Sequence, residues 1–160
     1  MTVKVLFVCL GNICRSPTAE GLFKARIAEA GLEAMIHTDS AGTGGWHVGN
    51  PPDPRAIKAA ADRGIDIRGL RARQVSEEDF ARFDYVLAMD EANLSDLQAL
   101  RPRTAQCQLK LYLDYAEDTD ETEVPDPYYG GDEGFLRVLD LIEQAADGLL
   151  ADIRKRHGVG

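Results

Sequence analysis

The chain has 160 residues, of which 44% are hydrophobic and 28% charged, and its formal net charge is −9 at pH 7. This composition is that of one globular domain with a buried core, which we place at residues 1–157. The acidic balance excludes a surface made for nucleic acids or anionic membranes. No apolar run approaches the roughly 20 residues that span a bilayer, and the N-terminus lacks signal-peptide features, so we expect a cytoplasmic protein.

The first half of the chain alternates predicted strands and helices. The first predicted strand, Val3–Cys9, is a nearly continuous apolar run, which is typical of a buried strand in a parallel sheet. Ser16 as N-cap and Pro17 at the first helical position predict a helix that closes at Gly31. The pattern then predicts a strand over 35–41, a loop rich in glycine and proline over 42–52, and a helix over 53–63.

The second half continues the alternation, with a short helix from residue 76, a strand over 85–89, a helix over 91–100 and a strand over 109–113. An acidic loop over 116–127 leads to a long helix over 133–155. Its apolar residues recur at helical spacing, and we expect one buried stripe: Phe135, Leu136, Leu139, Ile142, Ala146, Leu149, Leu150 and Ile153. The order predicts an α/β fold with a central four-stranded parallel sheet and helices on both faces.

The three cysteines, Cys9, Cys14 and Cys107, do not have the number or spacing of a secreted disulfide framework or of a zinc site. We expect them to be thiols and expect no metal or other cofactor. Cys107 precedes the fourth predicted strand and is interpreted as structural. Cys9 and Cys14 lie in the segment that joins the first strand to the first helix, and we expect one or both of these thiols to be reactive.

This joining segment has the features of a phosphate-binding loop. The first N–H groups of a helix have no partner within it and carry the positive end of the helix dipole, so they bind anions. Gly11 and Asn12 tolerate left-handed backbone conformations, which lets the chain curl into a nest of N–H groups. We therefore expect the substrate phosphate to be bound by Leu10, Gly11, Asn12, Ile13, Cys14 and Ser16. A nucleotide-binding P-loop is excluded, because no Gly-Lys-Ser/Thr follows.

Two side chains enter this nest. Cys9 ends the strand beneath the anion, where a helix start and a guanidinium favour the reactive thiolate form. Arg15, six positions later, can hold two phosphate oxygens with its planar fork, and the Ser16 hydroxyl can donate to the sulfur. The alternative is that Cys9 is a small buried apolar residue and Arg15 a surface charge. The strand before the loop and the Ser-Pro helix start after it favour the chemical interpretation.

The segment Val8–Glu20, VCLGNICRSPTAE, resembles the signature of the low-molecular-weight protein tyrosine phosphatases. Further segments resemble the same family in the same order, at 39–43, 46, 48–53, 64–66, 72–74, 87–90 and 124–129. The resemblance covers essentially the whole chain. The Cys-x5-Arg-Ser loop and the distant Asp126-Pro-Tyr-Tyr are its two specific motifs.

The resemblance implies a hydrolase that cleaves phosphotyrosine and small aryl phosphates through a phosphocysteine. Cys9 would be the nucleophile, Arg15 the phosphate clamp, and Asp126 the general acid that protonates the leaving phenol and then activates water. Trp46 and Tyr128 would form the walls of a deep slot, with Tyr129 at its rim. A deep slot favours phosphotyrosine over the shorter phosphoserine.

Supporting roles are also implied by the resemblance. Asn12 would hold its strained conformation through side-chain hydrogen bonds, with Ser40 in the same network. Cys14 would form a reversible disulfide with the nucleophile and so protect it from irreversible oxidation. One departure is Leu70, which stands where family members often carry a histidine that supports the loop asparagine. Either another group holds Asn12 or the loop is less rigid. His47, beside Trp46, is expected at the rim.

Two other functions use a similar loop and are less consistent with the sequence. An arsenate reductase on the same scaffold would need two further cysteines on a mobile segment, and the chain has only Cys107 outside the loop. A non-catalytic module that binds phosphotyrosine or other anions would not need Cys9 and Asp126 together. The expected partners are a phosphotyrosine protein as substrate, with a bacterial tyrosine kinase as a candidate, and inorganic phosphate as product. No nucleic acid or membrane partner is expected.

Overall fold

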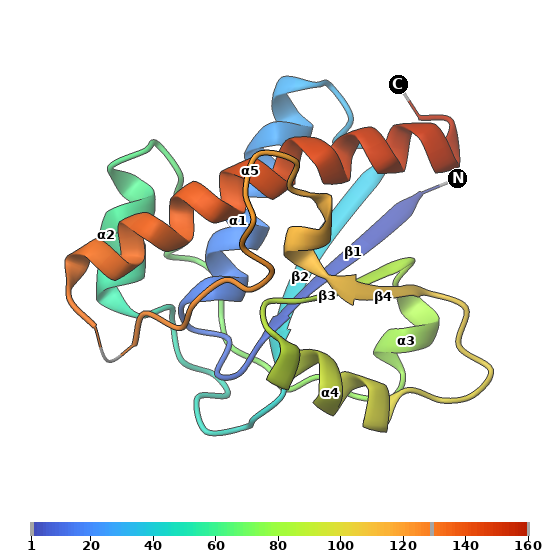
Figure 1. The fold of residues 1–160 in the computed structure, drawn as a ribbon, viewed down its shortest axis with the longest axis horizontal. Helices are drawn as coiled ribbons and strands as arrows, with labels where there is room; N and C mark the ends of the chain where they lie inside the picture. The colour runs from blue at the N-terminus through green and yellow to red at the C-terminus, as the bar shows by residue number, and fades with distance from the viewer. Residues whose placement is uncertain (1, 129, 160) are drawn as a thin grey trace.

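A four-stranded parallel sheet forms the centre of the computed structural model, which describes residues 2–128 and 130–159 (Figure 1). The strands lie in the order β2-β1-β3-β4, and every neighbouring pair is parallel. Their bounds are β1 Val3–Cys9, β2 Ile36–Gly42, β3 Tyr85–Ala88 and β4 Gln108–Leu111. The predicted α/β class and the four parallel strands are therefore confirmed.

Helices cover both faces of the sheet, as the alternation predicted. Figure 1 shows the long α5 crossing α1 and α2 on one side, while α3 and α4 lie on the other side. A short 3-10 helix, η1, follows β4. The bounds are α1 Arg15–Glu29, α2 Pro54–Ala61, α3 Asp79–Arg82, α4 Glu91–Leu100, η1 Tyr112–Tyr115 and α5 Asp132–His157. Across the described ranges, no helix is both long enough and apolar enough to cross a membrane.

Strand β1 supplies side chains to both hydrophobic cores. Phe7 packs edge-on against Phe23 of α1 and Tyr112 of η1, with ring centroids 5.9 and 5.3 Å apart. Leu6 and Val8 point to the opposite core, under α3 and α4. Because successive side chains of a strand alternate between the two faces, a central strand covered on both faces must be apolar at nearly every position. This explains the nearly continuous apolar run of the sequence.

Helix α1 begins earlier than predicted. Its N-cap is Cys14, without a side-chain hydrogen bond to the helix, so the predicted N-cap Ser16 and the predicted first helical residue Pro17 both lie inside the first turn, after Arg15. The predicted end is close, since the chain leaves the helix just before Gly31, whose φ of 72° lies in the left-handed region that glycine favours. The Ser16 hydroxyl is used within the phosphate loop instead of as a cap.

The predicted stripe of α5 is wrong at one position. Leu136 is 46% exposed, whereas Val138 and Leu141, which the stripe omitted, are buried with Phe135 and Leu139. Consecutive helical residues point about 100° apart, so the residue after Phe135 turns away from the face that packs on the sheet. The last strand is also shorter than predicted, because the chain turns into η1 at Tyr112.

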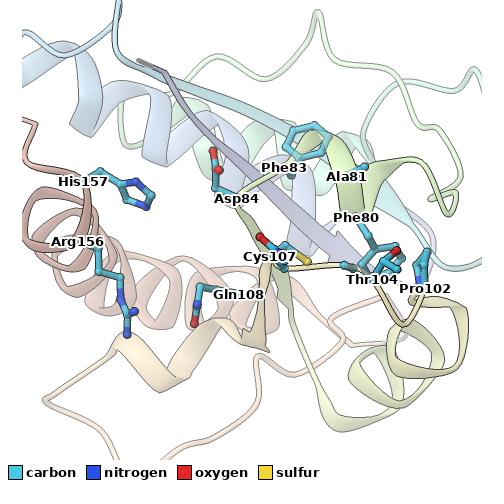
Figure 2. A pocket seen from close by; sticks show the side chains of 12 residues that line it. Phe80, Ala81, Phe83, Asp84, Pro102, Thr104, Cys107, Gln108, Arg156 and His157 are labelled. Carbon is cyan, nitrogen blue, oxygen red and sulfur yellow. The ribbon is translucent and has the colours of Figure 1, made fainter.

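A surface hollow of about 670 Å³ lies at the amino ends of β3 and β4, where Cys107 is buried (Figure 2). Its charged side chains are already paired: Asp84 accepts a hydrogen bond from the backbone N–H of Lys4, and Arg156 pairs with Asp152. Cys107 therefore lies at the edge of the sheet that is far from the loop joining β1 to α1. This position is compatible with the structural role predicted for it.

The carboxyl ends of the strands lie at the opposite edge. Cys9 ends β1 and pairs with Gly42 at the end of β2, and Asp90 follows β3. In open α/β sheets, ligands bind beyond this edge. The joining loop between β1 and α1 and the loops after β2 and β3 therefore meet at one place.

Candidate active site

The loop that joins β1 to α1 turns its carbonyl groups outward. The carbonyls of Cys9 and Leu10 each accept a hydrogen bond of 2.9 Å from the backbone of residues 43–44, and that of Ile13 accepts one of 2.8 Å from Asp53. In a trans peptide the N–H points opposite to the carbonyl, so the N–H groups of these peptides turn toward the loop centre. Inward N–H groups arranged in this way have the geometry of an anion nest.

Close packing behind the loop leaves no room for a side chain at Gly42. A Cβ there would lie 2.7 Å from the carbonyl oxygen of Leu10 and 3.2 Å from the backbone nitrogen of Asn12. Glycine at the end of β2 therefore allows the neighbouring strand to approach the loop and to support its curvature.

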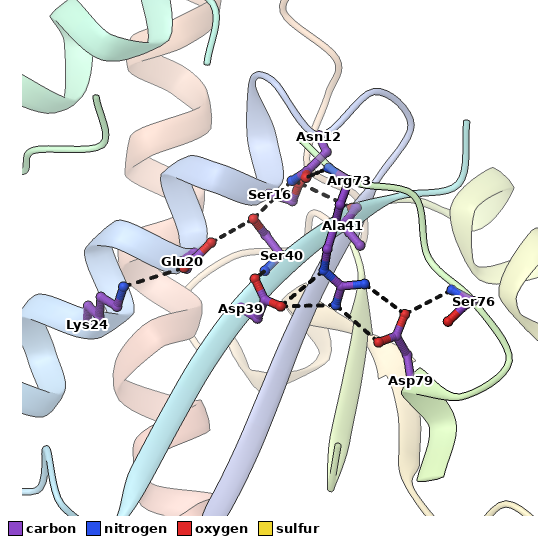
Figure 3. A network of polar contacts seen from close by, with 10 residues as sticks. All are labelled: Asn12, Ser16, Glu20, Lys24, Asp39, Ser40, Ala41, Arg73, Ser76 and Asp79. Carbon is purple, nitrogen blue, oxygen red and sulfur yellow. Dashed lines mark hydrogen bonds and ion pairs between the residues drawn. The ribbon is translucent and has the colours of Figure 1, made fainter. Parts of the chain in front are cut away.

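Asn12 has the strained backbone of the loop. Its φ is 58°, the only positive value at a non-glycine residue in the described part of the chain. Its side-chain amide donates to the hydroxyls of Ser16 (2.8 Å) and Ser40 (2.9 Å), and its Oδ1 accepts from the backbone N–H of Arg73 (3.0 Å) (Figure 3). Every hydrogen-bonding direction of the amide except one acceptor lone pair is used, which holds the strained residue in place.

Because the Leu70 side chain cannot donate a hydrogen bond, Asn12 is supported by the backbone of Arg73 instead. Leu70 packs against the core, and the N–H of Arg73 supports Asn12 where a histidine was missing. The guanidinium of Arg73 is held by Asp39 at 3.0 Å and by both carboxylate oxygens of Asp79, which is only 1% exposed (Figure 3). The ion pairs thus fix the segment whose backbone supports the loop.

The same network continues away from the loop to a buried acid. Ser40 donates to Glu20 at 2.7 Å, and Lys24 lies 3.6 Å from the other carboxylate oxygen. Burial raises the pKa of Glu20 above its ordinary value of 4.5, although the hydrogen bond from Ser40 opposes the rise. Asn12 therefore reaches a titratable group through one hydroxyl.

Cys9 lies at the floor of the loop, and its side chain is almost entirely buried. Its Sγ is 3.0 Å from the Ser16 hydroxyl and 3.3 Å from the backbone nitrogen of Asn12, which donates to it. The Ser16 oxygen accepts from the Asn12 amide, and its own hydrogen can be donated to the sulfur or, over 3.5 Å, to the carbonyl of Ala41. Two donors directed at one sulfur stabilise a thiolate, the nucleophilic form of cysteine.

Arg15 enters the site from the first turn of α1 and is 2% exposed. One terminal nitrogen donates to Asp90 (2.6 Å) and to the carbonyl of Val124 (3.0 Å), and the other lies 3.6 Å from Asp126. Burial alone would lower the pKa of Arg15, but the nearby Cys9 and Asp90 raise it above its ordinary value. The guanidinium is therefore charged and held by Asp90 and Val124, and Arg15 lines the same cavity as Cys9.

Asp126 reaches the site from the loop between η1 and α5, more than a hundred residues after Cys9. One carboxylate oxygen accepts a hydrogen bond of 3.0 Å from the backbone N–H of Tyr128, and the other is the oxygen that faces Arg15. The side chain is 41% exposed, so it stands at the entrance and not on the floor.

These groups line one cavity of about 310 Å³, formed by Cys9, Leu10, Gly11, Ile13, Cys14, Arg15, Trp46, His47, Asp126 and Tyr128. Two residues predicted to bind the phosphate, Asn12 and Ser16, are not among these lining residues, and their side chains bond to each other and support the loop from behind. Tyr129, predicted at the rim, lies outside the described residues. The cavity has a thiol and a guanidinium at its floor and a carboxyl group at its entrance.

Aromatic rings form the wall of the entrance. Trp46 is 73% exposed, with its ring directly over Gly44, where any side chain would collide with it. The rings of His47 and Tyr128 lie 6.4 Å apart. The expected rim position of His47 agrees with this arrangement.

Cys14 is the second thiol at the cavity. Burial, with smaller contributions from Asp53 and Cys9, raises the pKa of Cys14 to about 12. At neutral pH it is therefore a thiol and a weak nucleophile.

Sequence reasoning missed Asp90, Arg73 and Asp53, which support the loop and its arginine. A signal existed for Asp90, because a carboxylate just after β3 lies at the same edge of the sheet as Cys9. The contributions of Arg73 and Asp53 to the loop come from backbone N–H groups, which every non-proline residue has, and no residue pattern marks them.

The family comparison agrees with this geometry. Residues 4–158 match the profile described as "Low molecular weight phosphotyrosine protein phosphatase". The chain is 48% identical to the low molecular weight protein-tyrosine-phosphatase YfkJ of Bacillus subtilis, over 96% of this chain and 97% of the relative. It is 44% identical to the human low molecular weight phosphotyrosine protein phosphatase, over 86% and 87% of the two chains.

A crystal structure of a protein tyrosine phosphatase from Entamoeba histolytica, with Hepes in its active site, superposes with a TM-score of 0.92. That protein is 41% identical, and the alignment covers 98% of this chain and 99% of the other. With a matching profile over almost its whole length, this chain belongs to the low molecular weight phosphotyrosine protein phosphatases, which are hydrolases of phosphoric monoesters.

Proposed function

We propose that Cys9, Arg15 and Asp126 together hydrolyse phosphotyrosine in this protein, with Cys9 as nucleophile, Arg15 as phosphate clamp and Asp126 as general acid and base. The observation that carries the proposal is that two segments more than a hundred residues apart, the loop with Cys9 and Arg15 and the loop with Asp126, bring these side chains to one cavity of about 310 Å³. Each has partners that hold it in place: hydrogen-bonding groups at the sulfur, carboxylates at the guanidinium, and a backbone N–H that orients the Asp126 carboxyl group.

In the first step, the thiolate of Cys9 attacks phosphorus and the bond to the phenolic oxygen breaks. Arg15 and the inward N–H groups of the loop bind the three equatorial oxygens, where charge is redistributed in the transition state. Asp126, at the entrance, gives its proton to the departing phenolate. A phosphocysteine remains on the floor.

In the second step, water attacks the phosphocysteine from the side that the phenol has left. Asp126, now a carboxylate, accepts a proton from this water. The sulfur leaves as a thiolate, which Ser16 and the backbone of Asn12 stabilise, and inorganic phosphate is released. No metal takes part in either step, so a chelator is expected to leave the rate unchanged.

The position of the nucleophile supports an aryl substrate. Cys9 lies below walls formed by Ile13, Trp46 and Tyr128, so a phosphate must be delivered to depth by a long, flat group. The phenyl ring of phosphotyrosine has this length and can stack on aromatic rings. Phosphoserine is too short to reach the floor.

Hydrolysis of aryl phosphates by three proteins tests the proposal. We expect Cys9→Ser to abolish turnover while binding of inorganic phosphate or vanadate persists. We expect Asp126→Asn to lower kcat by about 10²–10⁴-fold, the usual contribution of a general acid, with the largest loss for poor leaving groups. Wild-type turnover in Cys9→Ser contradicts the mechanism, and binding of phosphotyrosine without any hydrolysis by the wild type indicates a binding module.

Arsenate reduction is not favoured. Cys107 is the only cysteine outside the loop, and it lies at the opposite edge of the sheet from Cys9. The chain therefore lacks the two further cysteines that an electron relay from Cys9 would need.

The physiological substrate is proposed as a class of protein. Family membership implies phosphoprotein substrates, and we include a bacterial tyrosine kinase among them on resemblance alone. A substrate-trapping Asp126 variant, used to capture phosphoproteins from the source cells, would identify the partner. The need for a free Cys9 thiol supports a reducing compartment such as the cytoplasm.

We propose that Cys14 protects Cys9 from irreversible oxidation by forming a disulfide with it. Peroxide would oxidise the Cys9 thiolate to a sulfenic acid, and attack by Cys14 would release water and form a disulfide between the two sulfurs. The raised pKa of Cys14 predicts that this second step is slow at neutral pH. Mass mapping of the oxidised wild type and of Cys14→Ser tests it: the variant should proceed to irreversible oxidation of Cys9.

A further inference from the structure

Asp126 lies on a loop that has little regular structure. The chain from residue 116 to residue 131 contains no helix or strand at the positions described, and Asp126 itself is 41% exposed. Before Asp126, the loop is held by Val124, whose N–H donates to Met89 and whose carbonyl accepts from Arg15. A general acid must stand within hydrogen-bond reach of one oxygen, so the other side of the loop also has to be held.

Arg55, in the first turn of α2, holds that other side. One of its terminal nitrogens donates to the carbonyl of Tyr128 at 2.8 Å, and another donates to the carbonyl of Gly130 at 3.2 Å. Its guanidinium also lies 5.7 Å from the centre of the Tyr128 ring and 4.8 Å from that of Phe135. Tyr128 in turn donates its N–H to the Asp126 carboxylate. Arg55 therefore holds the residue that orients the acid.

The same guanidinium is tied to the phosphate loop through Asp53. The carboxylate of Asp53 accepts from Nε of Arg55 at 3.1 Å, from a terminal nitrogen at 3.0 Å and from the backbone N–H of Arg55 at 2.8 Å. The backbone N–H of Asp53 donates to the carbonyl of Ile13 in the phosphate loop at 2.8 Å. A continuous path of hydrogen bonds thus joins the phosphate loop, through Asp53, Arg55 and Tyr128, to Asp126.

Both charges of this pair are maintained at neutral pH. Burial alone would raise the pKa of Asp53, but the hydrogen bonds from Arg55 lower it below its ordinary value. The hydrogen bond to Asp53 raises the pKa of Arg55. A fixed carboxylate beside the guanidinium directs the remaining N–H groups toward the loop of the acid.

We propose that Arg55 is a positioning residue for the general acid: it fixes the Asp126 loop at the distance from the phosphate loop that protonation of the leaving group requires. The proposal rests on the function proposed for Asp126. A guanidinium has five N–H groups in a fixed planar geometry, and Arg55 uses four of them to bind a carboxylate and two carbonyls at once. A lysine ammonium at this position keeps the charge and loses the planar geometry.

The test compares aryl phosphates with good and poor leaving groups, such as 4-nitrophenyl and phenyl phosphate, under pre-steady-state conditions that report formation of the phosphocysteine. We expect Arg55→Met to slow formation of the phosphocysteine from phenyl phosphate at least about tenfold, which is part of the 10²–10⁴-fold contribution of a general acid. Formation from 4-nitrophenyl phosphate should be slowed much less. We expect Arg55→Lys to show the same selective loss. An equal loss for both substrates, or wild-type rates in Arg55→Lys, overturns the proposal.

Arg63→Met is the matched control. Arg63 ties the chain just after α2 to Asp140 and Glu143 of α5, at 2.8 and 3.2 Å, and these contacts leave the Asp126 loop untouched. We expect this variant to unfold at a temperature similar to that of Arg55→Met, with wild-type dependence on the leaving group. A selective loss in Arg63→Met as large as that in Arg55→Met overturns the assignment.

A double-mutant cycle separates failure of this proposal from failure of the proposed function. We expect Arg55→Met to add less than about twofold to the loss in Asp126→Asn, because both variants remove the same proton transfer. Additive losses overturn the role of Arg55. If Asp126→Asn alone shows no selective loss, the function proposed for Asp126 fails first.

Discussion

The ion pairs of Arg73 give a stability prediction that reaches the active site. Arg73→Met removes the partner of Asp79, a carboxylate that is 1% exposed and otherwise accepts only from the backbone N–H of Ser76 among the bonds found in the described chain. Leaving a buried charge unpaired costs about 3–5 kcal/mol, whereas the exposed pair with Asp39 contributes at most about 1 kcal/mol. Since the Arg73 guanidinium is one-third exposed and partly screened by water, we expect the free energy of unfolding to fall by about 3 kcal/mol in total, near the lower end of this range.

For a domain of this size, about 3 kcal/mol lowers Tm by about 6–12 °C. The assay is urea unfolding of the variant beside Arg82→Met, which breaks a pair whose side chains are 64% and 74% exposed and should change stability by at most about 0.5 kcal/mol. The Arg73 variant should also lose kcat, because the ion pairs that the substitution removes fix the segment whose backbone N–H supports Asn12. A loss of stability below about 1 kcal/mol would refute the argument that Asp79 is a buried charge neutralised by Arg73.

Two further predictions concern charges in the site. Asp90→Asn removes the carboxylate 2.6 Å from Arg15, so kcat/KM for aryl phosphates should fall by about tenfold to a hundredfold and competitive inhibition by inorganic phosphate should weaken; unchanged inhibition contradicts this. For Glu20, burial raises the pKa in the folded state, so ionisation costs stability as pH rises above 4.5. The free energy of unfolding of Glu20→Gln relative to the wild type should therefore increase from about pH 4.5 to about pH 7.5, and parallel curves would contradict this assignment.

Local patterns were sufficient for much of the fold. The apolar run Val3–Cys9 and the helix Glu91–Leu100 have the bounds that the sequence predicted. The start of the helix is clear because Asp90 is its N-cap, whose side chain accepts from the backbone N–H of Asn93. The start of α1 was misplaced because Ser16 has the chemistry of an N-cap while its hydroxyl contacts the Cys9 sulfur.

The site was only partly predictable from residue patterns. The loop from Cys9 to Arg15 is local, and its spacing and glycine are visible in the sequence. Asp126 was found only through resemblance to a family, because one aspartate in an acidic loop carries no local mark. Arg55 lies far in sequence from the loop that it holds, and only the packing of α2 beside that loop brings them together.

The central claim is that Cys9 carries the phosphoryl group. The most direct measurement is rapid quenching of Asp126→Asn with 4-nitrophenyl phosphate, followed by peptide mapping by mass spectrometry, because loss of the base slows hydrolysis of the intermediate. We predict one phosphoryl group on the peptide that contains Cys9 and none in the Cys9→Ser variant. A phosphoryl group on another residue, or continued turnover without Cys9, would contradict the account.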